Sequence, residues 1–170
     1  MKLSPLPNQA VEVLKSLNAP PRLVAHLTLV HDVAVQITRA VNEIWPDMQY
    51  DRQAVLLGSA IHDIGKIAHP EELSQPGNQH EQTGPHLLTR WGISAHHARF
   101  AHTHGQWQET TNIEDLLVAL ADKVWKGARD EALEDTLVKC IANESHTEKW
   151  QVFASLDSMI VDIAELLKSV

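Results

Sequence analysis

A histidine and an aspartate stand side by side at the end of an apolar run, and this pair constrains the fold more than any other feature. His62 and Asp63 follow residues 54–61, which are all apolar except for one glycine and one serine. Burying an imidazole and a carboxylate costs free energy unless both are paired or bind a metal ion. Adjacent residues of a helix point about 100° apart, so both side chains can still reach one ion. Lys66 is expected on the face of His62, where its ammonium can bind phosphate.

Apolar residues recur at helical spacing almost throughout the chain, and the alternation typical of strands is nearly absent. Pro21 is expected to open a long helix that ends near Trp45. Asp51 is expected to cap the next helix, which carries His62 and Asp63. Further helices are predicted at about 8–17, 79–91, 94–100, 113–126, 131–143 and 147–167. The sequence therefore predicts an all-α protein.

Length and charge narrow the class of protein. The 170 residues predict one domain, a helical bundle over 1–170, with a metal-site core at about 26–126 that the helices of 131–167 complete. The net charge of −8 argues against nucleic acid as a partner, because no basic stripe can release its counterions. No run approaches the roughly 20 apolar residues that span a bilayer, and the first residues do not resemble a signal peptide. We therefore expect a cytoplasmic protein that binds no membrane.

Histidine is unusually clustered, since eight of the 11 histidines fall between His62 and His104. Four polar residues lie within apolar helical segments and need partners there: His31, His62, Asp63 and Asp122. Taken singly, each could be a helix cap, an ion-pair partner or a hydrogen-bonded core residue. Together they form a reasonable shell for Mn, Fe, Co, Ni or Zn. His26 precedes His31 by five residues and leaves its face, so we expect it to be structural or at the surface.

The order of these residues, with the wording His-Asp-Ile-Gly-Lys at 62–66, resembles the HD-domain superfamily of metal-dependent phosphohydrolases. The resemblance covers about 26–126 and implies an HD-type helical bundle. It also implies hydrolysis of phosphoester or phosphoanhydride bonds, often in nucleotides. In that family's arrangement one divalent metal ion would be held by four residues: His31, His62, Asp63 and Asp122.

Two further segments, one that begins at His80 and one at 101–105, resemble the binuclear branch of that superfamily. This resemblance implies a second metal ion bridged by Asp63 and held by His80 and His102, or by His104. The last two histidines point about 200° apart on an ideal helix, so both can reach one cluster only if the helix ends there. The Gly-Tyr-Pro of the cyclic di-GMP enzymes in that branch is absent, which puts that substrate in doubt more than the metal site.

The expected chemistry is attack of a metal-activated water on phosphorus. Asp63 would orient the water, Lys66 would neutralise charge on the phosphoryl oxygens, and His104 would be the general acid if it is not a ligand. Secondary phosphate-binding residues are expected among Arg90, Arg99, Lys123 and Lys126.

Two other functions stay open at this stage. Some HD-fold proteins are diiron oxygenases, for which the same shell of histidine and aspartate would serve. A non-catalytic nucleotide-sensing domain is the third alternative. The expected partner is a small phosphorylated molecule, including nucleotides, and the helix at 147–167 could either close the core or form a homodimer face.

Overall fold

The computed structural model describes residues 3–106 and 112–168, and within these ranges the chain is helical and contains no strand. The predicted all-α class is therefore confirmed. None of the described helices is long and apolar enough to cross a membrane. In chain order the elements are α1 (Asn8–Ser16), α2 (Pro21–Ile44), α3 (Arg52–Ile61), the 3-10 helices η1 (Ile64–Ile67) and η2 (Pro70–Leu73), α4 (Gln79–Trp91), α5 (Ala95–Ala98), α6 (Phe100–Thr103), α7 (Ile113–Trp125), α8 (Glu131–Ser145) and α9 (Lys149–Leu167).

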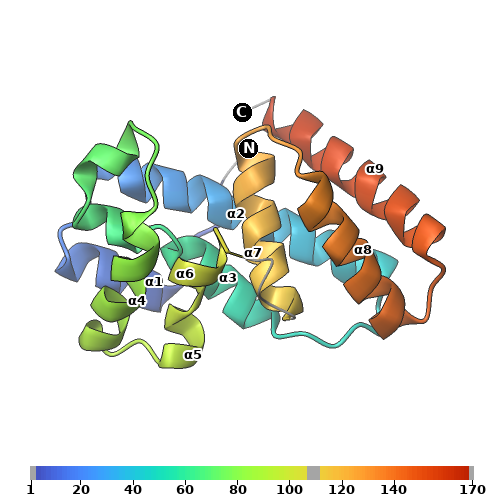
Figure 1. Cartoon of the computed structure of the whole chain (residues 1–170), viewed down its shortest axis with the longest axis horizontal. Coiled ribbons are helices and arrows are strands. Elements are labelled where there is room, and N and C mark those ends of the chain that lie inside the picture. The colour runs from blue at the N-terminus through green and yellow to red at the C-terminus, as the bar shows by residue number, and fades with distance from the viewer. Residues whose placement is uncertain (1–2, 107–111, 169–170) are drawn as a thin grey trace.

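The helices form two groups that share α2, α3 and α7. Figure 1 shows α8 and α9 at one end of the molecule and α1, α4, α5 and α6 at the other, with α7 between them. The long helix α2 packs against both α3 and α7 and also contacts α9. The chain thus brings residues from its first and last thirds against the same central helices.

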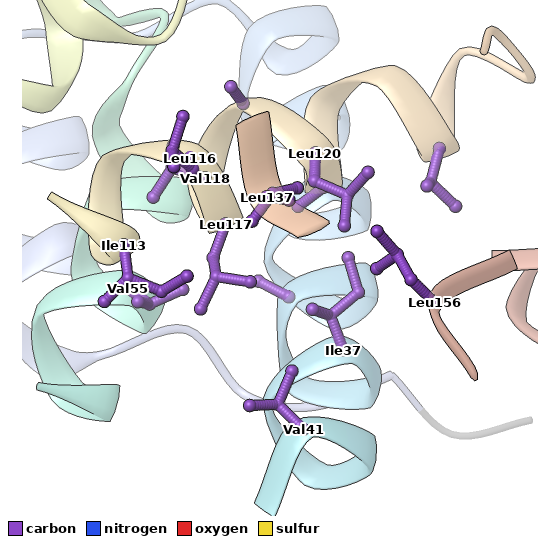
Figure 2. Packing of buried hydrophobic residues seen from close by; sticks show 14 of the residues in the cluster. Ile37, Val41, Val55, Ile113, Leu116, Leu117, Val118, Leu120, Leu137 and Leu156 are labelled. Atoms are coloured by element: carbon purple, nitrogen blue, oxygen red, sulfur yellow. The ribbon is translucent and has the colours of Figure 1, made fainter. Parts of the chain in front are cut away.

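Each group has its own apolar core. The larger core is built around α7, whose apolar side chains meet those of α2, α3, α8 and α9 (Figure 2). The smaller core joins α1, the first turns of α2, the end of α3, and α4 to α6. On α2 the change from one core to the other falls between Leu27, in the smaller core, and Val30, in the larger one. Polar side chains that lie near this boundary are shielded from water on both sides.

The boundaries of the helices follow the expected sequence signals with one instructive exception. Asp51 is the N-cap of α3, and its Oδ1 accepts the backbone N–H of Ala54 at 3.0 Å. The prediction that this helix carries both residues of the His-Asp pair was wrong. The helix ends at Ile61, His62 is its C-cap, and Asp63 already precedes η1. The pair therefore lies at a change of helix type rather than along one helix face.

Gly65 allows α4 to approach η1 closely. A Cβ atom at Gly65 would lie 2.1 Å from the backbone oxygen of His80 and 2.9 Å from the backbone nitrogen of Gly84. Any larger residue would push the two elements apart. Its φ is not positive, so the glycine is needed here for space rather than for a special backbone conformation. The absence of a side chain here is what sets His80 beside Asp63.

Candidate metal centre

Six polar side chains converge at the boundary between the two cores. They come from three α-helices and the C-terminal ends of two others: His26 (α2), His80 (α4), Asp122 (α7), His62 and Asp63 (the α3–η1 junction) and His104 (the C-cap of α6). Asp63 is the centre of this group, and only 1% of its surface is exposed. The structure thus brings together ligand types that are typical of divalent transition metals.

The two carboxylate oxygens of Asp63 face different histidines. Its Oδ2 lies 3.1 Å from Nε2 of His26 and 3.7 Å from Nε2 of His62. Its Oδ1 lies 3.1 Å from Nε2 of His80 and 3.4 Å from Nε2 of His104. Asp63 therefore divides the group into two halves, each with two imidazoles.

Asp122 belongs to the half that contains His26 and His62. Its Oδ1 lies 3.6 Å from Nε2 of each of these histidines. The other oxygen of Asp122 accepts a hydrogen bond from Lys126 Nζ at 2.5 Å, as Oδ2 of Asp63 does from Lys66 Nζ at the same distance. Each aspartate of the group therefore has one lysine as its counter-charge.

Three of the imidazoles are held in one tautomer by their outer nitrogen. Nδ1 of His62 lies 2.9 Å from the backbone oxygen of Ser59, and Nδ1 of His104 lies 3.1 Å from that of Phe100. Because a carbonyl oxygen can only accept, each Nδ1 must carry the proton. His80 is held in the same way by the carboxylate of Glu72. In the neutral ring, Nε2 then presents its lone pair to the centre of the group, as a metal ligand does.

The inner atoms of the group lack hydrogen-bond partners. Among the described residues six buried side-chain atoms have no hydrogen bond of acceptable geometry, and four of them lie in this group: Nε2 of His26, His62 and His80 and Oδ1 of Asp122. Leaving several buried polar atoms unsatisfied in one place is costly, and native structures rarely do so without a ligand. The residues therefore fit the metal ions that their chemistry implies.

Both aspartates are anionic near neutral pH. Burial raises the pKa of Asp63, but the charge of His62 and the contacts with the other histidines outweigh it and hold the pKa well below its usual range. Burial likewise raises the pKa of Asp122, but the contact with His62 and the charge of Lys126 outweigh this effect and hold the pKa below its usual range. Metal binding requires the carboxylates to be deprotonated, and these surroundings keep them so.

The prediction for the first histidine of the group was wrong, because His26 lies there and His31 does not. Arg52, at the start of α3, lies beside Thr38 of α2, since its Nε donates a hydrogen bond to Thr38 Oγ1 at 3.2 Å. From this contact α3 runs antiparallel to α2. His62 lies ten residues after Arg52, at the opposite end of α3, and is therefore beside His26 of α2. His31 instead is buried away from the group, and burial lowers its pKa. The antiparallel pairing of two helices joined by a short loop could have revealed this.

The structure also separates His104 from His102. The helix ends at Thr103, and His104 turns its ring toward Asp63, whereas His102 lies by a different cavity beside Pro85. The prediction that His102 belongs to the group was therefore wrong, since the two positions point in nearly opposite directions. The end of α6 at Thr103 therefore decides that His104, and not His102, joins the group.

Glu72 was missed by the sequence analysis. It lies in η2, and its carboxylate accepts hydrogen bonds from the backbone N–H groups of Gln79 and His80 at 3.0 and 3.2 Å, besides holding the His80 ring. Burial lowers the pKa of His80, but Asp63 and Glu72 outweigh this and raise it. A glutamate in a predicted loop carries no sequence pattern that would reveal this role.

A cleft opens over the group. Its volume is about 340 Å³, and its walls include Asp63, His80, His104 and Asp122. Of the four cations expected to bind phosphate, Lys123 and Lys126 line this cleft beside Lys66. Arg99 is instead engaged by the buried carboxylate of Asp115 at 3.1 Å, and Arg90 lies on α4 outside the described cavities. The cleft thus combines donor atoms for metal ions with lysine ammonium groups.

Comparison with known proteins gives one match. The family model of the HD domain matches residues 23–125, a segment that contains all six side chains of the group. No curated protein and no solved structure matches the chain.

Proposed function

Because this chain belongs to the HD domain family, which in general comprises metal-dependent hydrolases, we propose that it hydrolyses a phosphate ester or anhydride of a small molecule, nucleotides included. The observation that carries the proposal is the pairing of unsatisfied metal-ligand atoms with lysines in one cleft. In a chain of net charge −8, three lysines beside such a group favour an anionic substrate. Phosphate is the anion whose hydrolysis this combination serves best.

We propose two divalent transition metal ions, drawn from Mn, Fe, Co, Ni or Zn. His26, His62 and Asp122 would hold one ion with Oδ2 of Asp63. His80 and His104 would hold the other with Oδ1 of Asp63. When bound, such ions lower the pKa of a coordinated water and polarise phosphoryl oxygens.

The residues of the chain have distinct roles in this proposal. Asp63 spans both halves of the group and orients the attacking water between them. Lys66 Nζ, which is held by Asp63, neutralises the charge that develops on the phosphoryl oxygens. His104 serves as a ligand rather than as the general acid, because its proton is on Nδ1 and is donated to a backbone oxygen. Lys126 Nζ, with about half of its side chain exposed, can donate a hydrogen bond to the leaving group.

The test combines metal analysis with a phosphatase assay on the full chain. We expect about two equivalents of metal per chain, and hydrolysis of p-nitrophenyl phosphate or bis-p-nitrophenyl phosphate in the presence of Mn²⁺ or Co²⁺. Iron in the purified protein together with substrate-dependent oxygen consumption would instead establish the diiron oxygenase alternative. A chain that takes up none of the five metals would refute the proposal.

A further inference from the structure

Beside the cleft over the metal centre lies a second cavity, the second lobe, which shares part of its lining with the first. This lobe has a volume of about 460 Å³ and shares five residues with the first lobe: Lys66, Glu72, Gln75, Pro76 and Lys126. Its far wall is formed by the first turns of α2, through Arg22 and His26. A molecule bound at the metal centre can therefore extend past the two shared lysines toward the start of α2.

Cations outnumber carboxylates in the walls of the second lobe, and two of them, Lys66 and Lys126, are paired with the aspartates of the metal centre. Arg22, Lys66 and Lys126 line it, and the one carboxylate among its described walls is that of Glu72. Both oxygens of that carboxylate are already occupied by hydrogen bonds from Gln79 and His80. An excess of cations in a cavity of an acidic protein focuses the field on an anionic ligand.

Arg22 is the residue that distinguishes this lobe from the first. It makes no ion pair and no side-chain hydrogen bond within the described parts of the chain, although surplus carboxylates are abundant in this protein. Its planar guanidinium can bind a phosphate group through two parallel hydrogen bonds. The first turn of α2 adds the partial positive charge of a helix N-terminus.

The spacing between the two lobes is set by α2 itself. Arg22 and His26 are four residues apart, so they lie on the same face, about 6 Å apart along the helix axis. His26 contacts both aspartates of the metal centre. Arg22 therefore leaves α2 about one helical turn before the histidine that reaches the metal centre.

We propose that the second lobe holds a second phosphate group of the substrate, with Arg22 as its specificity-determining residue. The chain would then prefer substrates that carry two phosphate groups across a short spacer over simple monoesters. The inference rests on the proposed function, because the first phosphate is placed at the metal centre.

Isothermal titration calorimetry can test this on the full chain supplied with Mn²⁺, with ligand integrity followed by phosphorus NMR. The probes are adenosine 5′-monophosphate and adenosine 3′,5′-bisphosphate, which differ by one phosphate. We expect the bisphosphate to bind about tenfold more tightly, as one charge-assisted contact allows. Arg22→Ala should remove most of this difference and change the affinity for the monophosphate by less than about twofold. Arg90→Ala is the matched control and should change neither affinity.

The outcomes separate the two proposals. Equal affinities of the wild type for both probes, or equal weakening of both by Arg22→Ala, would overturn the second phosphate site and leave the hydrolase proposal standing. If neither probe binds to the metal-loaded wild type, the second phosphate site is overturned, whereas the hydrolase proposal is decided separately by the metal analysis and the p-nitrophenyl phosphate assay.

Discussion

Within the described residues, metal-ligand side chains gather in two places, one buried and one at the surface. Besides the metal centre between the cores, Asp51, His96 and His97 place one ligand atom each within 4.8 Å of one another. Asp51 and His96 are exposed, and His97 is partly buried. By composition and distance alone, either group would qualify as a metal site.

The two groups differ in what their polar atoms already bind. In the surface group Asp51 caps α3, and Nδ1 of His97 lies 3.2 Å from Ser94 Oγ, while water can reach the remaining atoms. In the buried group three imidazoles are fixed by hydrogen bonds at Nδ1, and four inner atoms have no hydrogen bond. Buried metal-ligand atoms that lack hydrogen bonds, rather than the closeness of ligand side chains, therefore distinguish a site built for a ligand.

The largest effect should come from removing the centre of the buried group. We expect Asp63→Asn to lose bound metal and to reduce hydrolysis by more than about 100-fold, because even outer partners of a metal site are worth 10–100-fold. Elemental analysis and the phosphatase assay measure both. The double variant His96→Ala with His97→Ala is the control and should keep the metal content of the wild type. If the control variant lost its metal and Asp63→Asn kept it, the surface group rather than the buried one would be the metal site.

Two pairs of histidines test the corrected membership of the group. His26→Asn and His104→Asn should each lower the metal content and the activity. His31→Asn and His102→Asn should keep the metal stoichiometry, and His31→Asn should mainly lower the unfolding temperature because that residue is buried. Metal analysis beside thermal unfolding separates the two effects. A loss of metal in the His31 variant at an unchanged unfolding temperature would restore the original assignment.

A smaller effect is expected from the residue that holds His80 from outside. Glu72→Gln removes the charge that orients the ring, and we expect metal affinity or activity to fall by about 10–100-fold. Glu71→Gln, next to it in the same 3-10 helix but about half exposed, should have no effect. Competition with a metal-binding dye measures the affinities. Equal affinities of the two variants would show that Glu72 does not orient the ring.

The smallest effect concerns the surface group and pH. Burial and the neighbouring His96 lower the pKa of His97, so below about pH 6.5 the unfolded chain takes up a proton first and the fold loses stability. Because the ring is only partly buried and solvent screens its charge, we expect His97→Asn to relieve less than about 0.5 kcal/mol of this loss. Urea unfolding of both proteins above and below that pH gives the difference. A larger acid sensitivity of the variant than of the wild type would contradict this sign.

Local patterns in the sequence determined the helices of this protein. Apolar periodicity and capping residues predicted the span of Gln79–Trp91 and the cap at Asp51 as the structure has them. These features depend on residues within a few positions of one another, so a single chain suffices to read them. The same reasoning selected His62, Asp63 and Asp122 as polar residues that needed partners, and the structure brings these three together.

The tertiary structure alone decided which other side chains join them. His26 rather than His31 joins the group because of the register in which α3 packs along α2. His104 rather than His102 joins it because the short helix α6 ends at Thr103. His80 lies beside Asp63 because Gly65 lets η1 and α4 approach closely, and Glu72 then holds the His80 ring from η2. Such contacts arise from packing between segments distant in the chain. A periodicity says which face of a helix is buried, but not which residue of the neighbouring helix it meets.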